Sequence, residues 1–132
     1  MSEGPRVTDR EIAAVLSLPG NVRYDRFIKT VADWETAWGL FDAGWALLGT
    51  QDGEAAFALW PTKEYANLCA TGEWASYSPR DIQLDDLVET LIPKLTADGV
   101  LVVVFSTPED RGVVTEPSAL ANDLEAASAE YE

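Results

Sequence analysis

The sequence contains no histidine and a single cysteine, Cys69, among its 132 residues. Without histidine the chain cannot form a Ser-His-Asp or Cys-His catalytic arrangement, and it lacks the usual near-neutral general base. One cysteine cannot form an intramolecular disulfide, and it cannot supply the four ligands of a structural zinc site. These absences exclude the commonest nucleophilic and zinc-dependent mechanisms and indicate a reducing compartment.

Long hydrophobic runs and targeting segments are also missing. The longest strongly apolar run, 100–105, is far too short to span a bilayer. The first five residues, Met-Ser-Glu-Gly-Pro, lack the basic and apolar regions of a signal peptide. We therefore expect a cytoplasmic protein with no membrane partner.

Cofactor-binding motifs are not found either. The glycines at 39, 44, 49 and 53 are spread over turns and do not form a dinucleotide-binding or phosphate-binding loop. Asp85 and Asp86 are neighbours on a predicted helix, where their side chains diverge by about 100° and do not chelate one ion together. Cys69 lies on an apolar helical face, which favours a core position over a nucleophile. We predict no cofactor, no metal and no catalytic residue, although carboxylate-based activity stays open.

Basic residues are few, and their distribution is uneven. The whole chain has 23 acidic and 9 basic side chains, a net charge of −14. Residues 1–30 carry four acidic and five basic side chains, so residues 31–132 hold a net charge of −15. Such a field repels nucleic acids and anionic membranes and attracts a basic protein. Solubility alone would also account for the charge.

Helical periodicity marks several segments. Thr8 and Glu11 form a capping box before a short helix that ends at Pro19-Gly20. Asn21 is predicted to cap a second helix, with an apolar face that Trp34 extends and a solvated side that carries Arg23, Arg26 and Lys29. Further helices are predicted over 62–70, over 84–98 with a kink or break at Pro93, and from Pro117 onward.

The remaining segments read as strands. Runs at 38–41, 45–48 and 55–60 are separated by turns at 42–44 and 51–53, which predicts a three-stranded antiparallel meander. Segment 74–77 is either a fourth strand or an extended link, and 113–114 starts a partner strand. The run 100–105 is apolar and β-branched, as in a central strand buried on both faces.

These elements predict an α+β fold with the order α-α-β-β-β-α-(β)-α-β-(β)-α. We expect a mainly antiparallel sheet of about four to six strands with helices packed on it. Residues 1–20 form an N-terminal extension with a helix, and residues 21–132 form a single α+β domain.

Aromatic residues are concentrated in the middle of the chain, where eleven of the thirteen lie between Tyr24 and Tyr77. Most must fill the core, but a core of this size does not readily hide all five tryptophans, and tryptophan and tyrosine are favoured interface anchors. Aromatics beside turns and helix starts are the best candidates. The candidate binding surface comprises Trp60, Lys63, Glu64, Trp74 and Tyr77.

The segment Trp60-Pro61-Thr62-Lys63-Glu64-Tyr65-Ala66 is distinctive. With Trp38-Gly39-Leu40, Gly44-Trp45-Ala46-Leu47, Gly72-Glu73-Trp74, Tyr77, Ile82-x-Leu84-Asp85-Asp86-Leu87 and Asp98-Gly99, the chain resembles bacterial proteins grouped as domain of unknown function 2750. The resemblance runs from about Tyr24 to about Leu124. It implies a small bacterial protein and brings no established activity or catalytic residue.

Two interpretations of the Trp60-Pro61 segment stay open. Pro61 can simply start a helix that Trp60 pins to the sheet. Alternatively, the free amide groups at the start of that helix, beside Lys63 and Glu64, offer an anion site.

The sequence thus supports two functions from different classes. The first is a non-enzymatic interaction module, resembling an immunity protein or adaptor, that engages a basic partner. The alternative is a small-molecule-binding protein or carboxylate-dependent enzyme with a tryptophan-lined pocket around Trp60, Lys63 and Trp74. A homodimer that covers its aromatic residues is a third possibility.

Overall fold

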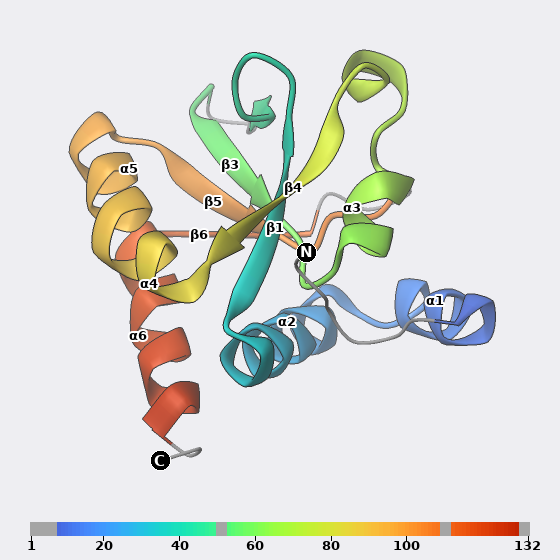
Figure 1. Cartoon of the computed structure of the whole chain (residues 1–132), viewed down its shortest axis with the longest axis horizontal. Helices are drawn as coiled ribbons and strands as arrows, with labels where there is room; N and C mark the ends of the chain where they lie inside the picture. The colour runs from blue at the N-terminus through green and yellow to red at the C-terminus, as the bar shows by residue number, and fades with distance from the viewer. Residues whose placement is uncertain (1–7, 50–52, 109–111, 130–132) are drawn as a thin grey trace.

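Residues 8–49, 53–108 and 112–129 are described by the computed structural model shown in Figure 1. They form an α+β fold with mostly antiparallel pairing, as predicted, but the strands are divided between a two-stranded and a four-stranded sheet instead of the single sheet expected. The strands are β1 (Thr36–Phe41), β2 (Leu47–Gly49), β3 (Ala55–Leu59), β4 (Ser78–Gln83), β5 (Leu101–Val104) and β6 (Val113–Thr115). The helices are α1 (Asp9–Leu16), α2 (Gly20–Trp34), α3 (Lys63–Leu68), α4 (Leu84–Asp86), α5 (Ile92–Asp98) and α6 (Pro117–Ala129), with shorter helical segments η1 (Gly72–Trp74) and η2 (Leu87–Leu91).

The four-stranded sheet has the order β2-β3-β5-β6. The central position of β5 confirms the prediction for the apolar run, and Val102 to Val104 are fully buried. The partner strand predicted at 113–114 is β6, which pairs with β5 in antiparallel fashion. In contrast, β3 and β5 are parallel, so their carboxyl ends meet at one edge of the sheet. Ligands commonly bind beyond the carboxyl ends of such strands.

The predicted three-stranded meander is only partly correct. The hairpin of β2 and β3 forms, although residues 51 and 52 of its predicted turn lie outside the described residues. β1 instead pairs along its full length with β4, a polar strand. Segment 74–77, predicted as a fourth strand or an extended link, instead holds the end of η1 and a turn, and β4 begins after it. Trp38 of β1 forms an isolated bridge with Trp60, the residue after β3. The polar residues of β4, with Pro79 among them, are typical of an edge strand. Because they do not alternate with apolar residues, hydrophobic periodicity did not predict this strand.

The first two helices correct two sequence predictions. Thr8 caps α1 as predicted, since its hydroxyl accepts the Glu11 amide at 3.1 Å. However, α2 begins at Gly20 with Pro19 at the cap position and no side-chain cap bond, so Asn21 is not the cap. Arg23 was expected on the solvated side but is only 2% exposed. Its guanidinium donates to the carbonyls of Phe105 at 3.3 Å and Leu18 at 2.5 Å, which offsets the loss of hydration.

The helix predicted over 84–98 forms, and Pro93 changes its type instead of breaking it. Pro93 lies in the first turn of α5, and the preceding segment η2 is π-helical. The amide of Ile92 donates to the carbonyl of Leu87, five residues back. Because proline lacks an amide donor, this wider turn accommodates the missing bond with Glu89. Gly99 then ends the helix in the left-handed conformation with φ 71°.

One hydrophobic core joins the sheets and helices. Val15 of α1 is buried in it, so the helix of the N-terminal extension packs on the same core as the rest. Gly112 follows the loop after β5, and a β-carbon there would lie 2.4 Å from the carbonyl oxygen of Val104. The helices α2, α5 and α6 pack together on the left and lower side of Figure 1. Among the described residues, none of the helices has both the length and the apolarity to cross a bilayer.

Candidate functional site

The structure buries one of the five residues of the predicted binding surface and leaves the other four exposed or half-buried. Trp60 is fully buried, so its side chain offers no surface to a partner. Trp74 is half-buried and meets Trp60 edge-on, with ring centroids 6.1 Å apart. Lys63 is exposed, whereas Glu64 and Tyr77 are half-buried. Trp74 lines a pocket of about 180 Å³ with Cys69 and Ser106.

At the start of α3, where an anion site was predicted, oxygen atoms of the chain itself already accept hydrogen bonds from two backbone amides. The Thr62 hydroxyl accepts the Tyr65 amide at 3.5 Å, and the Thr62 carbonyl accepts the Ala66 amide at 3.2 Å. Thr62 thus acts as the helix cap, and Trp60 is pinned to the sheet by its bridge to Trp38. The contacts at this point are those of a structural helix start.

The most exposed tryptophan is Trp34, which was predicted to extend the buried face of α2. Its side chain is 45% exposed, compared with 7% for Trp38 and 0% for Trp60. Trp34 is the last residue of α2, where helical periodicity no longer determines which side is buried.

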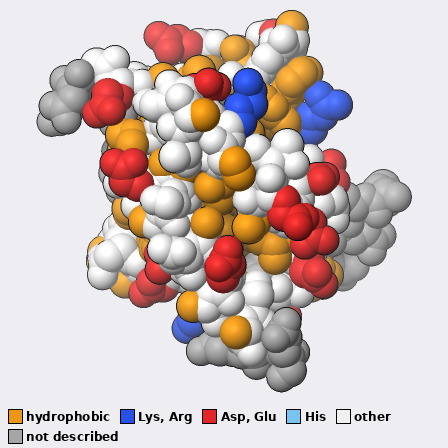
Figure 2. All heavy atoms as spheres, turned by 90° about the vertical axis from the view of Figure 1, so that its left-hand side faces the viewer, with side chains coloured by type: hydrophobic (Ala, Val, Ile, Leu, Met, Phe, Trp, Pro, Cys, Tyr) orange, Lys and Arg blue, Asp and Glu red, His pale blue; other side chains and the backbone are white. Residues whose placement is uncertain are grey.

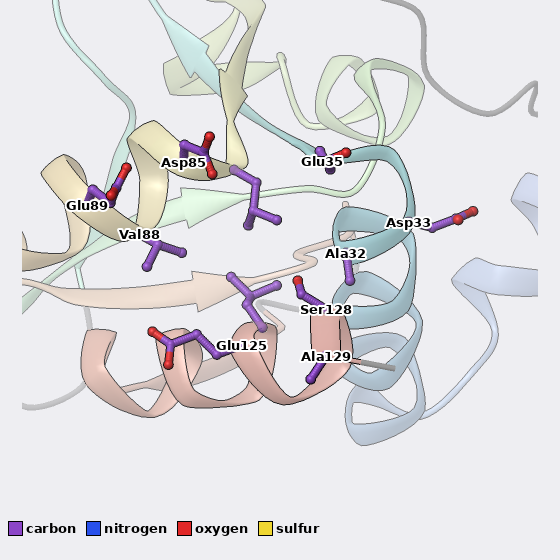
Figure 3. Close-up of a pocket in the computed structure, with 11 residues that line it drawn as sticks. Ala32, Asp33, Glu35, Asp85, Val88, Glu89, Glu125, Ser128 and Ala129 are labelled. Atoms are coloured by element: carbon purple, nitrogen blue, oxygen red, sulfur yellow. The ribbon is translucent and has the colours of Figure 1, made fainter. Parts of the chain in front are cut away.

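A cleft of about 750 Å³ lies between α2, the α4–η2 segment and α6 (Figure 3). We call it the acidic cleft. Its lining alternates between carboxylates at the rim and small or aliphatic side chains. The lining residues are Ala32, Asp33, Glu35, Leu84, Asp85, Val88, Glu89, Leu124, Glu125, Ser128 and Ala129.

Five carboxylates and no basic side chain line the acidic cleft. In Figure 3, Asp85 and Glu89 lie along the α4–η2 segment and Glu125 lies across from them on α6, while Asp33 points away from the other carboxylates. The described residues contain no group of three or more carboxylate, cysteine or histidine side chains that could hold a metal ion. The carboxylates are therefore spread along the cleft.

Backbone geometry adds to the negative potential of the cleft. The carboxyl ends of α2 and α6 both reach it, and neither helix has a basic residue in its last turn. The carboxyl end of a helix carries a partial negative charge. The amino end of α4 also lies here, but Asp85 and Asp86 occupy its first turn and oppose its positive dipole.

Glu35 connects two sides of the cleft in an unusual conformation. It has φ 56° and ψ 31°, the left-handed region that favours glycine. Its amide donates to the Val31 carbonyl at 2.7 Å, and its carbonyl accepts the Leu84 amide at 2.9 Å. This residue therefore links the end of α2 to the start of α4.

The floor of the cleft combines apolar surface with one polar atom that has no partner. The half-buried side chains of Leu84 and Val88 lie opposite buried Leu124. Within the described part of the chain, the buried Ser128 hydroxyl oxygen has no hydrogen-bond partner. In Figure 3 this oxygen points from α6 into the space beneath the α4–η2 segment. Figure 2 shows the side of the molecule on the left of Figure 1, with exposed hydrophobic side chains surrounded by mostly acidic ones.

A second pocket, of about 260 Å³, lies at the carboxyl ends of the parallel strands β3 and β5. Pro61 and Thr62 follow β3, and Phe105 follows β5. The pocket is also lined by Tyr65, by Trp34 and by charged residues of α1 and α2. It lies beside the Trp60-Pro61 segment that the sequence marked as distinctive.

Cys69 is a buried thiol, as its apolar helical face predicted. Its side chain is 7% exposed, and its sulfur donates to the Ser106 carbonyl at 3.4 Å. Burial raises the pKa of the thiol to about 11, although a hydrogen bond with Trp60 opposes the shift. The thiol is thus protonated at neutral pH, which suits a core residue and not a nucleophile.

Comparison with known proteins gives a family but no activity. The family model described as a protein of unknown function, DUF2750, matches residues 24–124. No curated protein matches the chain. No solved structure matches it either. The matched range covers most of the chain and includes the start of α3 and most of the acidic cleft, so the chain belongs to the DUF2750 family.

Proposed function

We propose that this protein is a non-enzymatic interaction module that binds a basic protein segment in the acidic cleft. The observation that carries the proposal is the cleft lining, in which five carboxylates and no basic residue surround an apolar floor. A lysine or arginine side chain matches both features, because its aliphatic stem packs on apolar surface while its charged end reaches carboxylates.

Long-range electrostatics support the same class of partner. The net charge of −14 accelerates encounter with a basic protein and repels phosphate backbones. The carboxyl ends of α2 and α6 strengthen the attraction for cations inside the cleft. The Ser128 hydroxyl adds a hydrogen-bonding group at the floor that has no partner among the residues the structure describes. The cleft accordingly distinguishes a cationic segment from a purely apolar one.

A pair of labelled peptides tests the proposal directly. The first is an amphipathic lysine-leucine peptide, and the second has the same pattern with glutamate in place of lysine. Fluorescence anisotropy should show saturable binding of the lysine peptide, weakening as sodium chloride rises from about 50 to about 500 mM because salt screens surface charges. The glutamate peptide should not bind. Equal binding of both peptides, or binding insensitive to salt, would contradict the proposal.

Matched variants locate the site. The double variant Glu89→Gln with Glu125→Gln removes two carboxylates from the cleft, and it should weaken binding roughly 3- to 30-fold. The control is Glu73→Gln with Glu116→Gln, which changes the net charge equally at exposed positions outside the cleft. If the two double variants lose affinity equally, the effect is due to net charge and the cleft is not the site.

Self-association is tested separately by sedimentation. A homodimer that covers the cleft would have to bring its carboxylates close to acidic surface of the second copy, which costs free energy at low salt. The proposal therefore predicts a monomer at about 50 mM salt. A dimer that dissociates when Val88 is replaced by lysine would instead assign this face to self-association.

A further inference from the structure

The pocket at the carboxyl ends of β3 and β5 has features that the acidic cleft does not share. It holds about 260 Å³, enough for a small metabolite and too little for a folded partner. Its walls come from α1, α2, the start of α3 and the end of β5, and they include the exposed Trp34. Asp33 lines both pockets, but no other lining residue is shared, so this is a second candidate site whose function does not depend on that of the cleft.

This pocket is lined by a residue whose buried hydroxyl group lacks a partner. Tyr65 is 3% exposed, and its hydroxyl oxygen has no hydrogen-bond partner among the described residues. A buried polar group in this state is destabilising, so a bound molecule that supplies a partner is stabilised. Two neighbouring side chains do have hydrogen-bond partners. The Cys69 thiol donates to the Ser106 carbonyl, and the Thr62 hydroxyl accepts the Tyr65 amide as the cap of α3.

The charges of the pocket reach the Tyr65 hydroxyl. Burial is the main cause that raises its pKa to about 12, the Glu11 carboxylate adds to the shift, and the Arg26 guanidinium opposes it. Both charged groups line the same pocket as Tyr65. At neutral pH the hydroxyl is protonated and can both donate and accept a hydrogen bond.

The charged lining is balanced. Glu11 and Asp33 contribute two negative charges, and Arg26 and Lys29 contribute two positive charges. The nitrogen of Arg26 and the oxygen of Glu11 lie 3.6 Å apart, and both side chains are well exposed. In a chain of net charge −14, a free anion is repelled. A ligand of zero net charge that carries both signs matches this lining best.

The apolar wall of the pocket is held in a fixed position. Phe105 has φ 60°, a conformation that is costly for an aromatic residue. Its amide donates to the Leu59 carbonyl at 2.9 Å, and its carbonyl accepts from Arg23 at 3.3 Å. The Phe105 ring packs against Tyr65 with centroids 4.8 Å apart. Both side chains are almost fully buried and form the back of the pocket, so the exposed Trp34 gives an apolar ligand side chain its surface next to the charged groups.

We propose that this pocket binds a small zwitterion of the amino-acid class. The ligand carboxylate lies near Arg26 and Lys29 and accepts from the Tyr65 hydroxyl. The ligand ammonium lies near Glu11 and Asp33, and the ligand side chain faces Trp34.

Calorimetric titration with the free L-amino acids, one at a time up to about 10 mM, tests the proposal. At least one should bind saturably and change the fluorescence of the intact protein, because Trp34 is at the pocket. The corresponding amine and carboxylic acid, which each carry one of the two charges, should bind at least roughly tenfold more weakly. No binding by any amino acid, or equal binding of the singly charged analogues, would overturn the proposal.

Variants assign the binding to the pocket. Tyr65→Phe removes one oxygen atom that has no hydrogen-bond partner in residues 8–49, 53–108 and 112–129, so the variant should fold, and it should bind the selected amino acid up to roughly tenfold more weakly. Arg26→Gln should also weaken binding. Glu89→Gln, in the acidic cleft, is the control and should leave affinity unchanged. If Tyr65→Phe is folded by circular dichroism and binds as tightly as the unaltered protein, the pocket is not the site.

Discussion

The indole nitrogen of Trp60 donates a 2.9 Å hydrogen bond to the carbonyl of Ser106, and both residues are buried. Trp60 follows β3 and Ser106 follows β5, so this bond ties together the carboxyl ends of the parallel strands. The thiol of Cys69 donates to the same carbonyl at 3.4 Å. Trp60, in the most distinctive segment of the sequence, thus holds together the sheet edge at which the 260 Å³ and 180 Å³ pockets lie.

Replacing Trp60 by phenylalanine should therefore destabilise the fold. The variant loses the bond to Ser106 and leaves space in a fully buried site, and we expect a loss of roughly 1–3 kcal/mol in the free energy of unfolding. Urea denaturation followed by circular dichroism measures this. Trp34→Phe is the matched control, because the 45% exposed Trp34 should change stability by less than about 0.5 kcal/mol. Equal losses in both variants would contradict the structural role of Trp60.

Arg23 should be as important for stability as an apolar core residue. Arg23→Met keeps a long side chain but removes the donors to the buried carbonyls of Leu18 and Phe105, and we expect a loss of about 2–4 kcal/mol. Arg23→Lys should recover only part of this, because an ammonium cannot reproduce the fork of a guanidinium. Lys29→Met, at an exposed position of the same helix, is the control and should be nearly neutral. A neutral Arg23→Met variant would show that these bonds contribute nothing net.

The burial of Arg23 is a feature that the sequence alone did not predict. The helices and the strand β5 were predictable, because a 3.6-residue period and a β-branched run are local signals. A buried arginine has no such signal: its partners Leu18 and Phe105 are backbone carbonyls that the fold brings to it. From the sequence alone, a charged residue on the side of a helix opposite its apolar face is predicted to be exposed to solvent.

The acidic cleft could not be predicted from the sequence for a related reason. Its carboxylates come from three separate stretches of the chain, represented by Glu35, Glu89 and Glu125. The uneven charge of the chain was visible in the sequence, but the meeting of these stretches depends on how α2, the α4–η2 segment and α6 pack. Likewise β4 pairs with β1 despite its polar sequence, because its backbone supplies the ladder bonds whatever its side chains are.

Because the buried Cys69 thiol is protonated, the free energy of unfolding should decrease as the pH rises through the alkaline range. Its pKa is raised by burial from 9.0 to about 11, so the unfolded chain loses this proton first as the pH rises. The contribution is fully present below about pH 9 and is lost as the pH rises towards about 11. Urea unfolding at several pH values should show a stability difference between the unaltered protein and Cys69→Ala that narrows over this range. A difference that stays constant or widens would contradict the raised pKa.

The same burial predicts slow chemical modification. At about pH 8, Ellman's reagent should label Cys69 slowly in the folded protein and rapidly in concentrated urea, because only the exposed thiolate reacts. Rapid labelling of the folded protein would show that the thiol is accessible and would reopen the case for a reactive cysteine.

Glu35 offers a test in which stability and binding change in opposite directions. Glu35→Gly relieves the left-handed conformation at the end of α2, and we expect a gain of about 0.5–1 kcal/mol in the free energy of unfolding. It also removes one carboxylate from the acidic cleft, so the lysine-leucine peptide should bind more weakly. Glu35→Gln separates the two effects, because it removes the charge and keeps the strained backbone: binding should fall without the gain in stability. A Glu35→Gly variant that is both less stable and equally tight in binding would contradict the strain at this residue and the role of its carboxylate.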